Sequence, residues 1–448
     1  MKKASLLHDY LGKYAAGHPW QLEAASLENI AQVVVIPALA EKKHIFDTLA
    51  SLAANAPEML ATTLVVCVIN NKADAKQEHR ADNAATLALL RALVEKKTPA
   101  LQAAPYAQME KIASSRLRLS VVDASSPGLE IPARAGGVGM ARKIGMDTAL
   151  RLTAPQGDGP RLILNLDADT LVAADYLQAV CGAFASRRAH AGVVAYEHQP
   201  SDDPAEHEAI ILYEIYLRSW VAGLTYARSP YAFHSVGSTM AVSAEGYLAV
   251  RGMNRRAAGE DFYFLNKLAK AGPVKQIRET VVYPSARISA RVPFGTGAAV
   301  NRLAATDSSP QIFYDARVFS VVKQWLALVA ESADRPAAEI IRKAARIDEA
   351  LASFLTARGF VAAWTKISVN AASEQVLLKN FHHWFDGFET LKLINFLSRE
   401  SLPRTGWRQA LEGMFASGGP AFGTQCGAVE SPSLQDPAAA LACLRRLT

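Results

Sequence analysis

The stretch from Leu162 to Asp175, L-I-L-N-L-D-A-D-T-L-V-A-A-D, constrains the fold of this chain more than any other. Its first five residues are rich in Leu and Ile, which is typical of a strand buried on both faces. Asp167 and Asp169 then follow, with one alanine between them. Because strand residues two apart point to the same side, both carboxylates are expected to leave the strand end together.

This pair of carboxylates predicts a site for a divalent cation. Two negative charges that close repel each other and are costly to bury unless a cation or ligand lies between them. Mg²⁺ and Mn²⁺ prefer oxygen ligands and pair readily with substrate phosphates. An Asp-rich turn after a strand is the alternative interpretation, because Asp is common in turns. The pattern alone leaves both open.

Strands and helices alternate around this stretch, and the alternation predicts the fold class. Strands are expected at residues 33–36, 64–69, 117–122, 162–166, 192–196, 237–242 and 281–283. Helices are expected between them, and the order indicates an α/β fold with a doubly wound, mostly parallel sheet. Ligands bind beyond the carboxyl ends of such strands, where Pro37, Asn70, Asn71 and the Asp pair are expected. Pro37 has no N–H to donate, so the first strand is expected to end there.

Changes in composition predict three parts in this chain of 448 residues. Residues 1–30 read as a short helical arm, and residues 31–310 as the α/β domain. Beyond about residue 310 the sequence turns to helix formers, so we expect a C-terminal helical domain over 311–448. Its apolar spacing predicts helices at 319–330, 337–355 and 376–397.

Charge and cysteine usage exclude several classes of protein. The net charge is +6, but Lys and Arg are spread along the chain, which favours acidic or phosphorylated ligands and argues against nucleic acid. The four cysteines lie far apart without metal-type spacing and are expected to be reduced thiols. No apolar run has the length of a signal peptide or a membrane span, so a soluble, cytoplasmic protein is expected.

Two glycine-containing motifs open predicted helices and supply further candidates. The glycine-rich entry at residues 136–139 could cradle a phosphate on its N–H groups, although an ordinary loop is the favoured interpretation of that stretch alone. Arg142, one turn further, could reach a diphosphate or face solvent. Glu260 and Asp261 follow Gly259 at a predicted helix start. These carboxylates could cap the helix, or one of them could serve as a general base.

Two histidines are lesser candidates. His234 precedes the segment S-V-G-S-T-M, where it could contact a ligand. His383 lies among aromatic residues of the C-terminal region. A histidine in such company is more often packed than catalytic.

In their order and spacing, six motifs resemble the GT-A fold of family 2 glycosyltransferases over roughly residues 31–300. They are V-V-V-I-P-A-L-A-E, I-N-N-K-A-D, G-G-V-G-M-A-R-K-I-G, L-N-L-D-A-D, S-T-M-A-V-S and G-E-D-F-Y-F-L-N-K-L-A-K-A-G. The resemblance implies a hexosyltransferase that uses a nucleotide-sugar donor, such as a UDP- or GDP-sugar. It also implies Mn²⁺ or Mg²⁺ as cofactor.

The same resemblance assigns residues to the donor site. In the family, the first strand-end loop and the turn after the second strand hold the nucleotide, and the D-x-D pair binds the metal that bridges the diphosphate. The donor-binding positions implied here are Pro37, Ala38, Glu41, Asn71, Arg142, Asp167, Gly237 and Arg291. Asp169 and Asp167 are the implied metal ligands.

The implied base is Asp261, with Glu260 beside it. It would deprotonate an acceptor hydroxyl, and a single displacement would then invert the anomeric carbon. Retention stays open, because related GT-A enzymes that act on small glycerate-type acceptors retain configuration. The acceptor itself is not identified by any motif.

The chain departs from the family pattern at three places. Asn70 and Asn71 replace the more usual Asp pair, which leaves the base preference open. Lys143 stands where the family usually has Asn. No histidine occurs between Asp261 and His382, so a third metal ligand after the base helix is missing.

Two other functions remain as alternatives. A non-catalytic nucleotide-sugar-binding or scaffold protein could keep the fold, although the intact D-A-D and E-D pairs argue against decay. A sugar nucleotidyltransferase would have a G-x-G-T-R-x-x-P-x-x-K type loop after the first strand, and P-A-L-A-E-K-K differs from it. The C-terminal helices could shape an acceptor pocket, mediate homodimerisation or contact a membrane surface peripherally.

Overall fold

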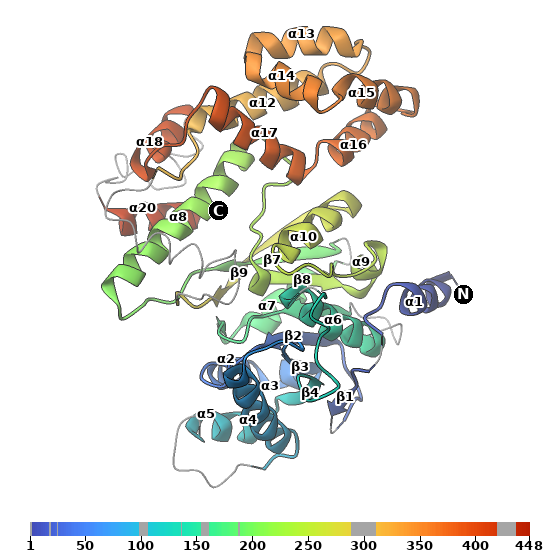
Figure 1. Cartoon of the computed structure of the whole chain (residues 1–448), viewed down its shortest axis with the longest axis vertical. Helices are drawn as coiled ribbons and strands as arrows, with labels where there is room; N and C mark the ends of the chain where they lie inside the picture. Colours follow the sequence, from blue (N-terminus) through green and yellow to red (C-terminus); the bar gives the residue numbers. More distant parts are fainter. Residues whose placement is uncertain are drawn as a thin grey trace. The chain divides into compact units, whose positions relative to one another are not determined.

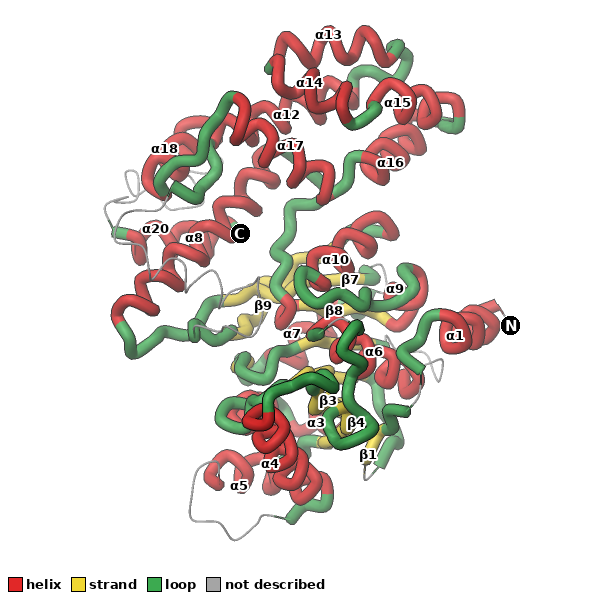
Figure 2. The backbone as a smooth tube through the Cα atoms, viewed as in Figure 1, coloured by secondary structure: helices red, strands yellow, loops and turns green. Residues whose placement is uncertain are grey.

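The computed structural model describes residues 2–17, 19–24, 26–97, 106–135, 137–153, 161–186, 189–287, 311–418 and 436–448. These residues form two compact units. The first comprises the described residues of Met1–Pro200 together with Ser235–Ala286. The second comprises Ser201–His234, Arg287 and the described residues after 310. Figure 2 shows that all strands of the sheet lie in the first unit, whereas the second is built of helices.

In the described part of the first unit, nine strands form one mixed sheet in the order β1-β4-β3-β2-β5-β8-β7-β9-β6 (Figure 1). Their bounds are β1 Leu22–Ala24, β2 Gln32–Ala38, β3 Thr63–Asn70, β4 Arg118–Ala124, β5 Leu162–Asn165, β6 Leu171–Val172, β7 Ala191–Tyr196, β8 Met240–Ser243 and β9 Val274–Tyr283. Strands β4, β3, β2 and β5 run parallel, as do β7 and β9, and the other neighbours are antiparallel. The predicted α/β class is confirmed.

Helices flank this sheet. They are α1 Lys2–Lys13, α2 Ile45–Ala53, α3 Pro57–Ala61, α4 Gln77–Val94, α5 Tyr106–Ser114, α6 Val138–Thr153, α7 Tyr176–Ala183, α9 Ala244–Ala249 and α10 Glu260–Ala271, with a 3-10 turn, η1, at Gly237–Thr239. Helix α6 packs closely on β2 and β3 because Gly145 has no side chain. A Cβ atom there would lie 2.3 Å from Val35 Cγ1 and 2.9 Å from Val68 Cγ2. The absence of a side chain at Gly145 therefore lets α6 lie close to both β2 and β3.

The expectation that the first strand ends at Pro37 is wrong. β2 continues to Ala38, and Pro37 pairs with Val68 of the parallel strand β3. On its other side, β2 pairs with β5 only as far as Val35, opposite Asn165. The proline therefore lies where the neighbouring ladder has already ended, so its missing N–H leaves no β5 carbonyl without a donor.

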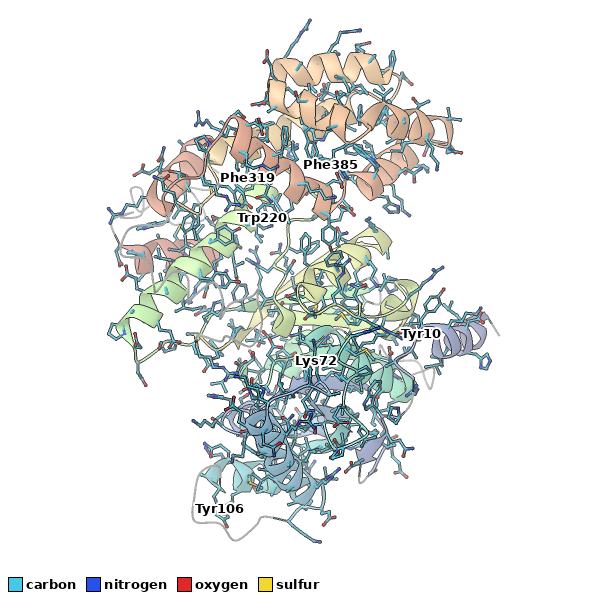
Figure 3. All side chains as sticks on the ribbon, in the orientation of Figure 1. Tyr10, Lys72, Tyr106, Trp220, Phe319 and Phe385 are labelled. Carbon is cyan, nitrogen blue, oxygen red and sulfur yellow. The ribbon has the colours of Figure 1, made fainter. Side chains whose placement is uncertain are left out.

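The second unit is helical in its described part. Its helices are α8 Pro204–Tyr226, α12 Ala316–Ala330, α13 Ala337–Ile347, α14 Glu349–Ala357, α15 Phe360–Val369, α16 Glu374–Trp384, α17 Gly387–Glu400, α18 Trp407–Gly418 and α20 Pro437–Leu447. Trp325 of α12 is fully buried, and its ring packs against Phe360, Phe381 and Phe385 at centroid distances of 5.3, 5.7 and 6.1 Å. Figure 3 labels Trp220 of α8, Phe319 of α12 and Phe385, the residue that follows α16, which all lie in or against this aromatic core.

Two long helices predicted for the C-terminal region are each broken in two. Asp348 ends α13 and caps α14, because its Oδ1 accepts hydrogen bonds from Ala350 N at 2.7 Å and Leu351 N at 3.2 Å. Asp386 separates α16 from α17 in the same way. An aspartate that satisfies the free N–H groups of a helix start can interrupt a continuous apolar pattern.

Cysteine chemistry differs in part from the expectation. Cys67 and Cys181 are free thiols, and burial raises the pKa of Cys67 above its ordinary value. Cys443 is disulfide-bonded, so the expectation of four reduced thiols is wrong for this residue. Within the described ranges, no helix combines the length and the apolar character needed to cross a membrane.

Candidate functional site

Asp167 and Asp169 lie just beyond the carboxyl end of β5, as the sequence predicted. The backbone around them is fixed by two side chains from other parts of the chain. Thr48 Oγ1 of α2 donates to Ala168 O at 3.0 Å, and Gln199 Nε2 donates to Asp169 O at 2.9 Å. Ala168 is buried between the two aspartates, which are partly exposed. A rigid backbone thus presents both carboxylates at the edge of the unit.

Arg142 connects this loop to the start of α10. Its Nη1 donates to Glu260 Oε1 and its Nη2 to Asp167 Oδ1. The side chains of Arg142 and Glu260 are each 4% exposed, and that of Asp167 is 37% exposed. Burial opposes the charge of the guanidinium, but the carboxylates of Asp167 and Glu260 raise the pKa of Arg142 above its ordinary value. We call Arg142, Asp167 and Glu260 the central ion set.

Gly237 makes room for this ion set. It is buried in η1, and a Cβ atom at this position would lie 2.2 Å from Arg142 Nη2 and 2.6 Å from Arg142 Cζ. Only a residue without a side chain lets the guanidinium lie there. Gly237 and Arg142, which were both expected to bind the donor, therefore lie side by side.

Asp261 follows Glu260 in the first turn of α10. The preceding Gly259 has a φ of +67°, a left-handed conformation that favours glycine at this helix start. Asp261 Oδ1 accepts a hydrogen bond from Phe262 N at 2.7 Å. Burial and the negative charge of Glu260 raise the pKa of Asp261 to about 7, while Arg142 acts in the opposite direction. A carboxyl group with such a pKa can take or release a proton near neutral pH.

The predicted nucleotide-binding residues come together at the carboxyl ends of β2 and β3. Pro37, Ala38, Glu41 and Asn71 are all buried. The amide of Asn71 is used inside the protein, since its Nδ2 donates to Lys72 O at 3.1 Å and its Oδ1 accepts from Asn83 Nδ2 at 2.9 Å. The Asn71 side chain therefore helps to stabilise the turn that follows β3.

Asn83 is a residue of this region that sequence reasoning missed. Besides Asn71, its Nδ2 donates to Asn70 O at 3.0 Å, and its Oδ1 accepts from Ala40 N at 2.9 Å. The side chain of α4 therefore ties the loop after β2 to the turn after β3. The only sequence signal is a polar residue on the buried side of a helix, where an amide needs partners.

The remaining predicted residues are Arg291, His234 and His383. Arg291 lies outside the described residues. His234 is buried in the second unit, and His383 is exposed on α16. The backbone carbonyl of the neighbouring His382 accepts a hydrogen bond from Tyr231 Oη at 2.5 Å.

The two carboxylates at the site are too few to hold a divalent cation by themselves, so a cation bound there would also need oxygen ligands from water or substrate. Among the described residues, no group of three His, Cys, Asp or Glu side chains could hold a metal ion. Asp167 and Asp169 alone are a partial set, which is how Mg²⁺ is commonly bound together with substrate phosphates. Three buried polar groups nearby have no hydrogen-bond partner in the described structure: the Asn165 amide, Ser238 Oγ and Arg142 Nε. Such groups normally bind water or a polar ligand.

One sequence-family model matches part of the chain. Residues 162–306 match the sequence model of glycosyl transferase family group 2. Both the D-A-D and the G-E-D segments lie within this match. No curated protein matches the chain. Over these residues, the match agrees with the resemblance to family 2 glycosyltransferases that the sequence motifs predict.

Two solved structures illustrate the similarity to known proteins. TarS 1–349 of S. aureus in complex with UDP-GlcNAc is 14% identical, with a TM-score of 0.35, and the alignment covers 93% of this chain and 90% of that chain. The mannosyltransferase PcManGT of Pyrobaculum calidifontis in complex with GDP-Man and Mn²⁺ is 15% identical, with a TM-score of 0.34. That alignment covers 88% of this chain and 92% of the mannosyltransferase.

Proposed function

We propose that this protein is a glycosyltransferase that moves a sugar from a nucleotide-sugar donor to an acceptor hydroxyl, with Asp261 as the general base. The observation that carries the proposal is the central ion set. Arg142 holds Asp167, at the end of β5, and Glu260, at the start of α10, through one guanidinium group. A predicted cation ligand and the neighbour of the predicted base are thereby fixed relative to each other.

The residues perform the transfer in one step in this mechanism. Asp261 takes the proton from the acceptor hydroxyl while the acceptor oxygen forms a bond to the anomeric carbon. The bond between that carbon and the donor diphosphate breaks at the same time, and the nucleoside diphosphate leaves. Because the attack and the departure are on opposite sides, the product has inverted configuration. The raised pKa of Asp261 makes it a better proton acceptor than an ordinary aspartate.

Asp169 and Asp167 are the proposed ligands of a divalent cation, Mn²⁺ or Mg²⁺. When bound, the cation would neutralise the negative charge that develops on the departing diphosphate. Arg142 Nη2 donates to Asp167 Oδ1, and we propose that both aspartates share the cation.

Asp169→Asn is expected to remove metal-dependent nucleotide binding. The neutral amide keeps the size of the side chain but loses the charge that a hard cation requires. Titration of Mn²⁺ in the presence of nucleotide, followed by calorimetry, measures the effect. Asp175→Asn is the matched control, because this aspartate is in the same segment and its Oδ1 accepts from Thr280 Oγ1 at 2.6 Å. Unchanged Mn²⁺ titration of the Asp169 variant would show that the ligands lie elsewhere.

The donor class is tested by thermal unfolding of the full chain with UDP, GDP, dTDP and CDP, each with and without Mn²⁺. A ligand at about 100 times its dissociation constant stabilises a protein by roughly 2.7 kcal/mol. A shift with one nucleotide that requires Mn²⁺ would support the proposal and identify the donor class. If a nucleotide binds but the corresponding donor sugar is never released, a non-catalytic nucleotide-sugar-binding protein becomes the better description.

A further inference from the structure

The N-terminal helix α1 is connected to α6 through one buried carboxylate. Asp147 is 1% exposed and accepts hydrogen bonds from Tyr10 Oη at 2.5 Å, Tyr247 Oη at 2.7 Å and Ala16 N at 2.6 Å. Lys143 Nζ lies 3.1 Å from Asp147 Oδ2 and donates to Tyr10 Oη at 2.9 Å. Tyr10 is labelled in Figure 3 and comes from the helix that Figure 1 draws at the N-terminus. The Tyr10 hydroxyl thus donates a hydrogen bond to Asp147 and accepts one from Lys143.

The same N-terminal segment also holds the loop of residues 251–256, which leads to Glu260 and Asp261. Gly252 has a φ of +70°, and a Cβ atom there would lie 2.0 Å from Tyr10 Oη. Arg255 Nη2 donates to Ala15 O at 3.0 Å, and the Arg251 guanidinium lies 5.1 Å from the centre of the Tyr14 ring. Tyr10 therefore fills the space that Gly252 leaves open.

This loop also contacts the first turn of α6 directly. A Cβ atom at Gly139 would lie 2.3 Å from Arg256 O and 2.9 Å from Asn254 O. From the other side, Lys267 Nζ of α10 donates to Val250 O at 2.9 Å and to Gly252 O at 2.6 Å. The loop is therefore held between α1, α6 and α10.

From these contacts we propose that residues 10–16, the N-terminal clamp, are a positioning element of the catalytic site. The clamp touches α6, which carries Arg142, and the loop that leads to Glu260. On α6 the clamp contacts Asp147 and Lys143, and Lys143 directly follows Arg142 in the sequence. Ahead of α10 the clamp contacts the loop that precedes Glu260. This inference rests on the proposed function, because it assigns the clamp to the ion set that carries that proposal.

The clamp acts by fixing the distance between α6 and the start of α10. Arg142 of α6 and Glu260 at the start of α10 are 118 residues apart in the sequence. They can therefore meet only while the packing of the two helices keeps their separation. Without the Tyr10 hydroxyl, Asp147 loses one of its donors and Lys143 loses an acceptor. The loop at 251–256 then has more freedom, and Asp261 is less often placed for proton transfer. Donor binding is expected to change little, because Thr48 and Gln199 hold the backbone of the Asp167–Asp169 loop independently of the clamp.

The test compares Tyr10→Phe with Tyr106→Phe in the full chain. Tyr106 is exposed on α5, outside the clamp, and its hydroxyl has no hydrogen-bond partner in the part of the chain that the structure describes. For Tyr10→Phe we expect about a tenfold lower turnover number of sugar-nucleotide hydrolysis, with an unchanged KM for the donor. Tyr106→Phe should leave both constants unchanged. Equal turnover in the two variants, or a loss confined to KM, would overturn the proposal.

A second measurement does not depend on enzymatic activity. Amide hydrogen exchange is followed in peptides covering residues 251–262 for both variants. Tyr10→Phe should speed exchange there at least several-fold relative to Tyr106→Phe, and unchanged exchange would contradict the clamp. If exchange responds as expected while the wild type neither binds nor hydrolyses any sugar nucleotide, then the clamp stands and the proposed function fails.

Discussion

Asp261→Asn is expected to abolish most sugar transfer while leaving donor binding near normal. Loss of a general base typically lowers turnover by about 10²–10⁴-fold. In the proposed mechanism the donor is held by Asp167 and Asp169, so its dissociation constant should change little. Turnover is measured as release of nucleoside diphosphate, and binding is measured separately by calorimetry.

A control separates catalysis from helix capping, which is the other role of a carboxylate at a helix start. Asp203 caps α8 and accepts hydrogen bonds from Ala205 N at 2.9 Å and Glu206 N at 3.1 Å. Asp203→Asn should keep full activity, because asparagine also caps helices well. Full turnover by the Asp261 variant would show that another group is the base.

The raised pKa of Asp261 also predicts how turnover depends on pH. A general base must be ionised, so turnover of the wild type should rise with pH up to about 7 and level off above it. The small residual activity of Asp261→Asn should not show this rise. The comparison is made with saturating donor, so that the profile reports the enzyme–donor complex.

Stability of the ligand-free protein should change with pH in the opposite direction. The pKa of Asp261 is about 7 in the folded protein, against an ordinary value of 3.8. Between these two values the folded state holds a proton that the unfolded state has released, so the free energy of unfolding falls as pH rises. Asp261→Asn removes this contribution. A variant whose stability falls over the same pH range as the wild type would assign the effect to another group.

The parts of the fold that could be predicted from the sequence are those with a local signal. The apolar run before Asp167 predicted β5, and the polar residues at the ends of β2, β3 and β5 predicted one edge of the sheet. Gly259 predicted the start of α10. Each of these depends on residues that are close together in the chain.

Contacts between distant residues could not be predicted in this way. The sequence placed Arg142 near a diphosphate, but nothing in it showed that the same guanidinium binds Glu260, 118 residues away. The link between Tyr10 and Asp147 spans 137 residues. Such pairs depend on how the helices pack on the sheet, and an isolated Arg, Asp or Tyr has no pattern that names its partner.

Arg142→Met is expected to destabilise the protein strongly. The variant leaves Glu260 buried without its counter-ion, and breaking a buried ion pair on one side typically costs about 3–5 kcal/mol. Arg142→Lys should recover only part of this, because one ammonium group lacks the fork with which the guanidinium reaches Asp167 and Glu260. Urea unfolding of the full chain measures the loss.

Arg91 offers a matched control, since it also bridges two carboxylates. Its Nη2 lies 2.7 Å from Glu23 Oε1 and 3.2 Å from Asp123 Oδ2, but its side chain is 45% exposed. Water screens such a pair, so Arg91→Met should cost only about 0–1 kcal/mol. Similar losses in the two variants would mean that burial of the central ion set has no special effect on stability.

The double variant Arg142→Met/Glu260→Gln separates the structural role of Arg142 from its role in catalysis. Replacing both partners removes the uncompensated charge, so much of the stability should return. Turnover should stay low, because the proposed mechanism also needs Arg142 to hold Asp167. If turnover returned together with stability, Arg142 would serve only to keep Glu260 buried, and the central ion set would no longer support the proposed function.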